Sequence, residues 1–277
     1  MPPRIDLHMH TTYSDGFYSP LELIKLANER KLDIISITDH DSVNAIEEAT
    51  TIGNDFGVTV IPGMEISTDI EDKEVHLLGY YIDVNHPELK KYLSFFRDER
   101  YHRAIRIVNK LNKIGLKITI DDVMSVAKSS AVGRPHIALA MVNLGFVNEY
   151  YEAFEKYLRD NGPAYERKIH VSPQSALKLI SDAGGLSFIA HPGHLKESIL
   201  VNLINAGIDG IEVVHPSHNL YQQKFYRGIV SQYCLLESGG SDFHGGKKGD
   251  DNNLGAYLLQ PQRLEEMRHI LASKPIL

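Results

Sequence analysis

Short apolar runs of strand length alternate with amphipathic segments of helical spacing over the first part of the chain. The apolar runs cover residues 5–7, 33–38 and 58–62, and helix-like segments separate them. Strand–helix–strand units of about 25 to 30 residues indicate right-handed crossovers, which join parallel strands in a sheet or barrel. We therefore predict an α/β fold for this part of the chain.

Two of the connecting segments carry helix signals. The first begins with Ser19 at the N-cap, Pro20 in the first turn and Glu22 three residues after the cap, which together make a capping box. The apolar face of this helix is predicted to consist of Leu21, Ile24 and Leu26. A second helix is predicted over residues 42–49. Both helices would lie between predicted strands, as a parallel arrangement requires.

The pattern changes near Pro87, where the strand signals stop. Charge-rich amphipathic segments replace them, and we predict helices over residues 92–115, 122–128, 135–144 and 148–158. The alternation returns at Pro173, with strands predicted over residues 186–190, 211–214 and 235–237. The chain is therefore predicted to contain one barrel domain, residues 1–96 and 170–277, which is interrupted by a helical insertion, residues 97–169.

Composition narrows the class of protein. The chain has 277 residues, of which 43% are hydrophobic and 23% charged, which is typical of a globular domain. No apolar stretch approaches the roughly 20 residues of a membrane span, and the first residues fit no signal peptide. The single cysteine, Cys234, is expected to be a small core residue, and without a disulfide partner it favours a cytoplasmic location.

The charge balance bears on possible ligands. The formal net charge is -7, so no overall basicity indicates a nucleic-acid-binding surface. Bound divalent ions would make one pocket positive on an otherwise acidic protein. An anionic substrate is therefore compatible with this balance, although the balance does not require one. The sequence indicates no membrane and no obligate protein partner.

Side chains that bind metals follow most of the apolar runs. The nine residues are His8, His10, Asp15, His40, Glu65, His76, His191, Asp242 and His244. His8 and His10 are two apart at a strand end, so their imidazoles project to the same side, and Asp242 and His244 repeat that spacing. A site assembled from many strand ends requires this placement, whereas a buried core does not. The pattern predicts a metalloenzyme.

The ligand types indicate which ions would bind. Mixed imidazole and carboxylate donors suit manganese, iron or zinc, and the absence of thiolates argues against a structural zinc site. Nine ligands exceed the needs of one ion, whereas two or three ions with a bridging carboxylate account for them. Any one of the 14 histidines taken alone is better explained as a surface or core residue, so the interpretation depends on the joint pattern.

The motifs around these ligands resemble those of the polymerase and histidinol phosphatase (PHP) superfamily. The matching segments are His8-Met9-His10, Ser14-Asp15-Gly16, Thr38-Asp39-His40-Asp41, Pro62-Gly63-Met64-Glu65, Ala190-His191-Pro192 and Gly240-Ser241-Asp242-Phe243-His244-Gly245. The resemblance implies a distorted (β/α)7 barrel with a trinuclear metal site at the carboxyl ends of its strands. Two insertion segments, Gly133-Arg134-Pro135-His136 and Gly162-Pro163-Ala164-Tyr165, further resemble the branch of 3',5'-nucleoside bisphosphate phosphatases and RNase AM 5'-to-3' exoribonucleases.

The resemblance also implies a ligand assignment for two to three ions, with manganese expected and zinc or iron as alternatives. It assigns His8, His10, Glu65 and Asp242 to the first ion. It assigns Asp15, His40 and His244 to the second, and His76 and His191, with Glu65 bridging, to the third.

The attacking group expected from this resemblance is a metal-bridging hydroxide. The candidate assisting groups are Asp15, His40, His194 and His218. The candidate substrate contacts are Arg103, Arg134, His102, His194 and His244. The helical insertion is expected to cover the active site, although Arg/Glu-rich helices are usually only solvated surfaces.

Three functions are compatible with these features. The first is hydrolysis of nucleotide phosphate esters, either at the 3'-phosphate of a 3',5'-bisphosphate or by trimming of short 5'-phosphorylated RNA or DNA. The second is hydrolysis of histidinol phosphate, which needs no arginine-rich insertion because the substrate is small. The third is a non-catalytic interaction module, against which the complete ligand set argues.

Overall fold

The computed structural model describes residues 2–71, 73–128, 131–169, 171–193, 195–246 and 249–274. The chain divides into two compact units, residues 1–90 with 170–277 and residues 91–169. The division falls after residue 90, inside helix α3 (Pro87–Lys113), whereas the sequence placed the boundary at residue 96. Each unit is described by itself.

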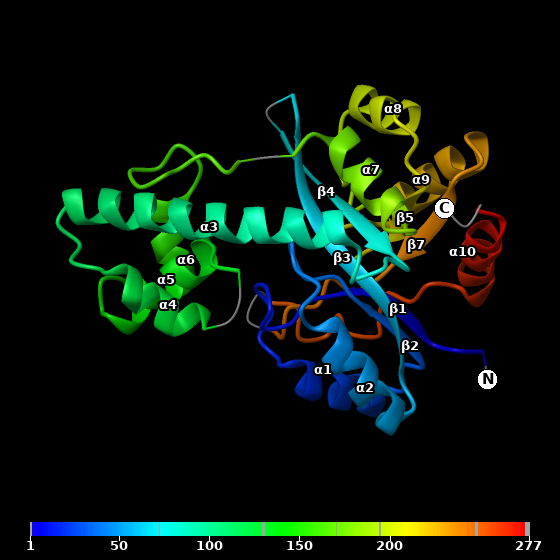
Figure 1. Ribbon diagram of the computed structural model, residues 1–277, viewed down its shortest axis with the longest axis horizontal. Helices are drawn as coiled ribbons and strands as arrows, with labels where there is room; N and C mark the ends of the chain where they lie inside the picture. The colour runs from blue at the N-terminus through cyan, green and yellow to red at the C-terminus, as the bar shows by residue number, and fades with distance from the viewer. Residues whose placement is uncertain are drawn as a thin grey trace. The chain divides into compact units, whose positions relative to one another are not determined.

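The larger unit is built on a seven-stranded sheet in which every described strand lies beside its neighbour in sequence (Figure 1). The strands are β1 (Ile5–Met9), β2 (Ile34–Ile37), β3 (Thr59–Ile70), β4 (Lys73–Tyr80), β5 (Leu186–Ile189), β6 (Gly210–Val214) and β7 (Leu236–Gly239). The sheet closes because Met9 pairs in parallel with Phe243, beyond β7, and the His10 N–H donates to the Phe243 carbonyl at 2.9 Å. The predicted barrel is confirmed.

One strand runs against the others. β4 is antiparallel to both β3 and β5, and the remaining pairs are parallel. The sequence predicted a strand only as far as Pro62, but β3 continues to Ile70 and pairs residue by residue with β4, from Gly63 opposite Tyr80 to Ile70 opposite Lys73. This hairpin takes the place of one strand–helix–strand unit and accounts for the distortion of the barrel.

The helices of this unit are α1 (Pro20–Glu29), α2 (Ile46–Phe56), α7 (Pro173–Asp182), α8 (Glu197–Asn205), α9 (Leu220–Gln232) and α10 (Pro261–Ser273). The capping box of α1 is confirmed, because the Glu22 carboxylate accepts from the Ser19 N–H at 2.8 Å. Its predicted apolar face is wrong at Leu21, which is exposed. The buried positions Leu23, Ile24 and Ala27 follow helical spacing from Pro20.

α2 begins later than the sequence predicted. The Ser42 hydroxyl accepts from the Asn44 N–H at 3.3 Å, and Asp41 has a positive φ of 48°. A serine side chain bonded to nearby backbone competes with helical hydrogen bonds, so the segment turns before the helix starts at Ile46.

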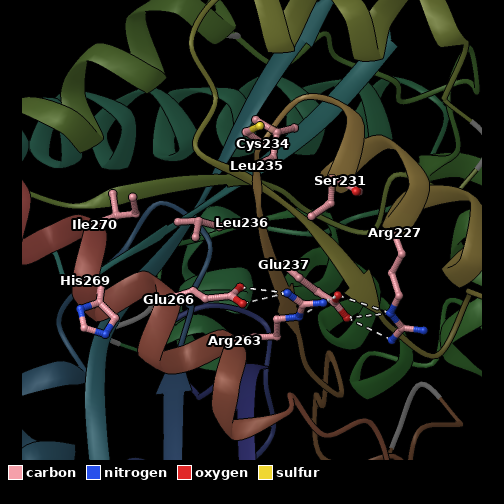
Figure 2. A pocket seen from close by; sticks show the side chains of 11 residues that line it. Arg227, Ser231, Cys234, Leu235, Leu236, Glu237, Arg263, Glu266, His269 and Ile270 are labelled. Atoms are coloured by element: carbon pink, nitrogen blue, oxygen red, sulfur yellow. Dashed lines mark hydrogen bonds and ion pairs between the residues drawn. The ribbon is translucent and has the colours of Figure 1, made fainter.

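A hollow of about 470 Å³ is lined by α9, β7, α10 and the turn before β7. Figure 2 shows the side chains that line it. The buried Glu237 accepts from Arg227 of α9, with Nη2 at 3.0 Å, and lies 3.3 Å from Nε of Arg263 of α10. Cys234 is exposed beside this hollow, so its expected place in the core is wrong. It adopts a φ of 53° in the turn before β7 and lies outside the strand. The ion pairs tie both helices to β7.

The smaller unit consists of helices, with no strand among its described residues. It contains most of α3, followed by α4 (Ile120–Ala127), α5 (Arg134–Asn143), α6 (Tyr150–Ala153) and a π-helical turn, Phe154–Leu158. A separate core, which includes Leu111, Val123 and Met141, holds these helices together. Across the described parts of the chain, no helix combines the length and apolar character of a membrane span.

The core of the barrel offers a direct test of packing. Phe188 on β5 is fully buried, and a Cβ atom built on Gly210 of the neighbouring β6 would lie 2.2 Å from its ring. We expect Phe188→Ala to lower the free energy of unfolding by about 3 to 5 kcal/mol, because it leaves a cavity in a closely packed interior. Urea denaturation would measure this. The control is Phe225→Ala, the same substitution at a site that is 46% exposed. An equal loss in both variants would contradict the packing described.

Candidate metal centre

All nine predicted ligands lie in the barrel unit, at the end of the barrel where its parallel strands terminate. His10, His40, His191 and Asp242 come just beyond β1, β2, β5 and β7. His76 lies inside β4, but because β4 is antiparallel, its beginning lies beside the carboxyl ends of its neighbours. The reversal of β4 therefore brings His76 to the same end of the barrel.

The first group of donor atoms is compact. Nε2 of His8 lies 3.4 Å from Glu65 Oε2 and 3.3 Å from Asp242 Oδ1. Nε2 of His10 lies 3.4 Å and 3.1 Å from the same two oxygens. Tetrahedral coordination with bonds of about 2.0 to 2.1 Å separates ligand atoms by about 3.3 to 3.5 Å. The spacing therefore suits one ion.

Glu65 serves two groups through its two oxygens. Oε2 belongs to the first group, and Oε1 lies 2.8 Å from Nδ1 of His76 and 3.1 Å from Nε2 of His191. The hairpin explains the approach of His76. Glu65 is opposite Leu78, and His76 is two residues from Leu78 on the same face of the sheet. The carboxylate thus lies between two clusters of imidazoles.

A further group surrounds Asp15. Its Oδ1 lies 3.3 Å from Nε2 of His244, and 3.9 Å from both Nδ1 of His10 and Nε2 of His40. The His10 and His244 rings stack at a centroid distance of 4.2 Å. One donor atom from each of these four residues lies within 4.8 Å of the others. The His10 ring therefore stands between the first group and this one.

The hydrogen bonding of these side chains fits a cluster of cations. Among the described residues, several buried ligand atoms make no hydrogen bond, including Nε2 of His8, Nδ1 of His40 and Oε2 of Glu65. Leaving one such atom unsatisfied costs about 1 to 3 kcal/mol, so a native site normally supplies a partner. Divalent ions bound among these donors would satisfy them.

Burial and the charges around Glu65 set the protonation states of the ligand side chains. Burial lowers the pKa of His40 to about 3, so its ring is neutral at physiological pH. Burial alone would raise the pKa of Glu65, but His40, His76 and His8 together hold it well below its usual range. Burial also lowers the pKa of His76, but the carboxylates of Glu65 and Glu74 outweigh it and raise that pKa to about 10. An ion bound beside Glu65 would replace the His76 proton.

Buried acids that the sequence analysis gave no role hold the loops of the site. Asp39 accepts from the Thr11 N–H at 2.7 Å and from the Ser14 hydroxyl at 2.5 Å, which fixes the loop before Asp15. Asp6 accepts from the Ser241 N–H at 2.9 Å and joins β1 to the segment after β7. For Asp6, the sequence signal was a single acid within an apolar run, which a core position would not carry.

Two glycines allow the loops to approach the first strand. A Cβ atom on Gly16 would lie 2.3 Å from the His10 carbonyl oxygen, and one on Gly240 would lie 2.4 Å from the His8 nitrogen. Asp242 and His191 adopt positive φ values of 48° and 26°. Strained backbone of this kind gathers at functional sites, where the surrounding structure holds it in place.

The hydrogen bonds of the ring nitrogens show which histidines near the site could transfer a proton. The His218 ring spans Val213 and Gly193, since Nδ1 donates to the Val213 carbonyl at 3.0 Å and Nε2 accepts from the Gly193 N–H at 3.1 Å. Both nitrogens are thus used in holding a loop, which argues against a role as proton donor. In a further histidine nearby, His215, Nδ1 accepts from the Ser217 N–H, so its Nε2–H faces Asp242 at 3.4 Å. His194 lies outside the described residues.

The predicted substrate contacts other than His194 and His244 belong to the helical unit. His102 is exposed on α3. Arg103 is buried, and its Nε donates to the Glu166 carbonyl at 2.9 Å. Nη1 of Arg134 donates to Asp160 at 2.6 Å and to the Leu158 carbonyl at 3.1 Å. Both guanidinium groups therefore stabilise the helical unit, and their contact with substrate stays a prediction.

Comparison with known proteins agrees with this geometry. The chain is 32% identical to a 5'-3' exoribonuclease of Haemophilus influenzae, over 88% of this chain and 91% of that protein. It is also 32% identical to a 3',5'-nucleoside bisphosphate phosphatase of Chromobacterium violaceum, over 89% of each. A solved structure from Bifidobacterium adolescentis, provisionally named a metal-dependent phosphoesterase, superposes with a TM-score of 0.87 at 31% identity and 96% coverage of both chains. Residues 6–158 match the PHP domain, and the chain belongs to the PHP domain family.

Proposed function

We propose that this protein is a metal-dependent phosphoesterase that hydrolyses phosphate esters of nucleotides. The substrates proposed are the 3'-phosphate of nucleoside 3',5'-bisphosphates and short 5'-phosphorylated RNA or DNA. The relatives named for these two activities support the proposal. The observation that carries it is the buried Glu65, whose two oxygens face two different groups of imidazoles.

The chemistry follows from the donor groups. Divalent ions bound close together supply Lewis acidity toward a phosphoryl group and lower the pKa of bound water. The chain's own residues would hold these ions in place, with Glu65 shared between two groups and Asp15 facing a third. No side-chain nucleophile is needed for this reaction. Manganese is the metal proposed, with zinc or iron as alternatives, because mixed imidazole and carboxylate donors suit all three.

The first prediction concerns metal content. Full-length protein treated with a chelator and then dialysed against Mn²⁺ should bind two to three ions per chain, as measured by elemental analysis. Glu65→Gln should bind at least one ion fewer, because a neutral amide cannot serve two cations. Glu237→Gln is the matched control, since this buried glutamate on β7 pairs with arginines away from the ligands. Uptake of one ion or none by the unaltered protein would contradict the proposal.

The second prediction concerns the substrate. With Mn²⁺, the protein should hydrolyse adenosine 3',5'-bisphosphate and short 5'-phosphorylated RNA far faster than histidinol phosphate. Phosphate release and product length on gels would measure this. Glu65→Gln should lose activity by orders of magnitude and keep its fold by circular dichroism. Faster turnover of histidinol phosphate would instead identify a biosynthetic phosphatase. Inactivity on all three with metals bound would favour a non-catalytic module.

The third prediction concerns Arg134. If this residue binds the phosphate that is not cleaved, Arg134→Ala should raise the barrier in kcat/KM for a bisphosphate by about 1.5 to 3 kcal/mol, the range of charge-assisted hydrogen bonds. Hydrolysis of an aryl phosphate, which lacks the second phosphate, should hardly change. The matched control is Arg97→Ala, at an exposed position of α3.

An equal loss on both substrates would give Arg134 a different role. The main role of Arg134 would then be to stabilise the helical unit through its hydrogen bonds to Asp160 and Leu158. In that case the variant should unfold at a lower temperature. The melting temperature of each variant separates these outcomes.

A further inference from the structure

Glu212 is a buried carboxylate that touches two of the proposed ligand residues. It lies in β6 and is fully buried. Its Oε1 is 2.8 Å from Nδ1 of His8, and its Oε2 accepts from the backbone N–H of His191 at 2.6 Å. His8 belongs to β1 and His191 follows β5, so one carboxylate connects residues from two other strands.

We propose that Glu212 is a positioning residue that prepares His8 and His191 together for binding separate metal ions. This inference rests on the proposed function, because it requires that metal ions occupy the site. Glu212 itself would coordinate no ion, and its effect would pass through the two histidines.

The contact with His8 selects one form of its ring. A carboxylate oxygen only accepts hydrogen bonds, so Nδ1 of His8 carries a hydrogen, and in the neutral ring that a metal binds, Nε2 then has the lone pair. That Nε2 is the atom 3.4 Å from Glu65 Oε2 and 3.3 Å from Asp242 Oδ1. Carboxylates placed behind metal-binding imidazoles commonly fix both tautomer and orientation in this way. Glu212 therefore aims the coordinating nitrogen of His8 into the first group.

The contact with His191 acts on the backbone. His191 has a φ of 26°, which is strained for a residue with a side chain. The hydrogen bond from its N–H to Glu212 holds the chain in this conformation, and Nε2 of the ring then lies 3.1 Å from Glu65 Oε1. The ligand of the third ion is thus held by the same side chain that orients His8.

A separate metal site formed by His8, Glu212 and His215 is the competing explanation, because their donor atoms lie close together. The hydrogen bonds argue against it. Nδ1 of His8 is occupied by Glu212, and its Nε2 faces the first group. Nδ1 of His215 accepts from the Ser217 N–H, and its Nε2 faces Asp242. The His8 ring therefore presents a hydrogen, and no lone pair, to Glu212.

The decisive variant is Glu212→Gln, which keeps the shape of the side chain. An amide has one accepting oxygen and one NH₂ group, so it cannot accept from both the His8 ring and the His191 N–H. We expect affinity for the ions assigned to His8 and His191 to fall by about 10- to 100-fold, the usual effect of removing such a partner. The ion assigned to Asp15, His40 and His244 should keep its affinity.

Titration calorimetry of Mn²⁺ into chelator-treated full-length protein would measure these affinities. Glu237→Gln is the matched control, because Glu237 is buried on the adjacent strand, where its carboxylate pairs with Arg227 and Arg263. Its metal affinities should equal those of the unaltered protein. Melting temperatures without metal should fall by similar amounts in the two variants. Unchanged metal binding in Glu212→Gln, or an equal weakening in both variants, would overturn the proposal.

A second measurement uses the unaltered protein and does not depend on a variant folding. In zinc-loaded protein with ¹⁵N-labelled histidine, NMR should show a hydrogen on Nδ1 of His8 and none on Nε2. A hydrogen on Nε2 would overturn the proposal.

The outcomes of these experiments also distinguish the role of Glu212 from the proposed function of the protein. Metal uptake and hydrolysis by the unaltered protein, with normal metal binding in Glu212→Gln, would refute only the role of Glu212. Failure of the unaltered protein to bind ions would refute both.

Discussion

The site depends on the burial of the Glu65 carboxylate among histidine rings. The side chain is fully buried, and its oxygens lie within 3.4 Å of nitrogens from five histidines: His8, His10, His40, His76 and His191. An ionised carboxylate in such a place requires compensating positive charge, since removing it from water costs several kcal/mol. Glu65 can therefore stay buried only where cations or protonated rings surround it. The histidines that lie near the ends of the strands supply the protonated rings and would hold the cations.

The ligands are held by a second set of acids placed behind them. Asp6, Asp39 and Asp250 each accept hydrogen bonds from backbone N–H groups at the loops that carry ligands. Most of these bonds join segments far apart in sequence, so they fix one loop relative to another. The barrel supplies the position of each strand end, and these acids fix the loops that carry Asp15, Asp242 and His244.

Much of this arrangement could be predicted from local sequence. The capping box at Ser19 and the strand before His191 depend only on neighbouring residues, and both were found. The sequence did not predict that β3 extends to Ile70 and pairs with β4, because the register of a hairpin depends on contacts between its strands. Glu212 was missed for a similar reason: its partners are 204 and 21 residues away. The buried face of α1 was predicted wrongly at Leu21, because this residue is apolar but exposed.

The reversal of β4 affects the order in which the chain can fold. Glu65 and His76 meet within a single hairpin, and hairpins of this kind form in roughly 1 to 10 μs. His8 and Asp242 come from opposite ends of the chain and meet only when the barrel closes. Long-range closure must first lose chain entropy, so it forms late. We therefore expect a nascent metal-binding pair in the newly made chain well before the last ligands have been synthesised.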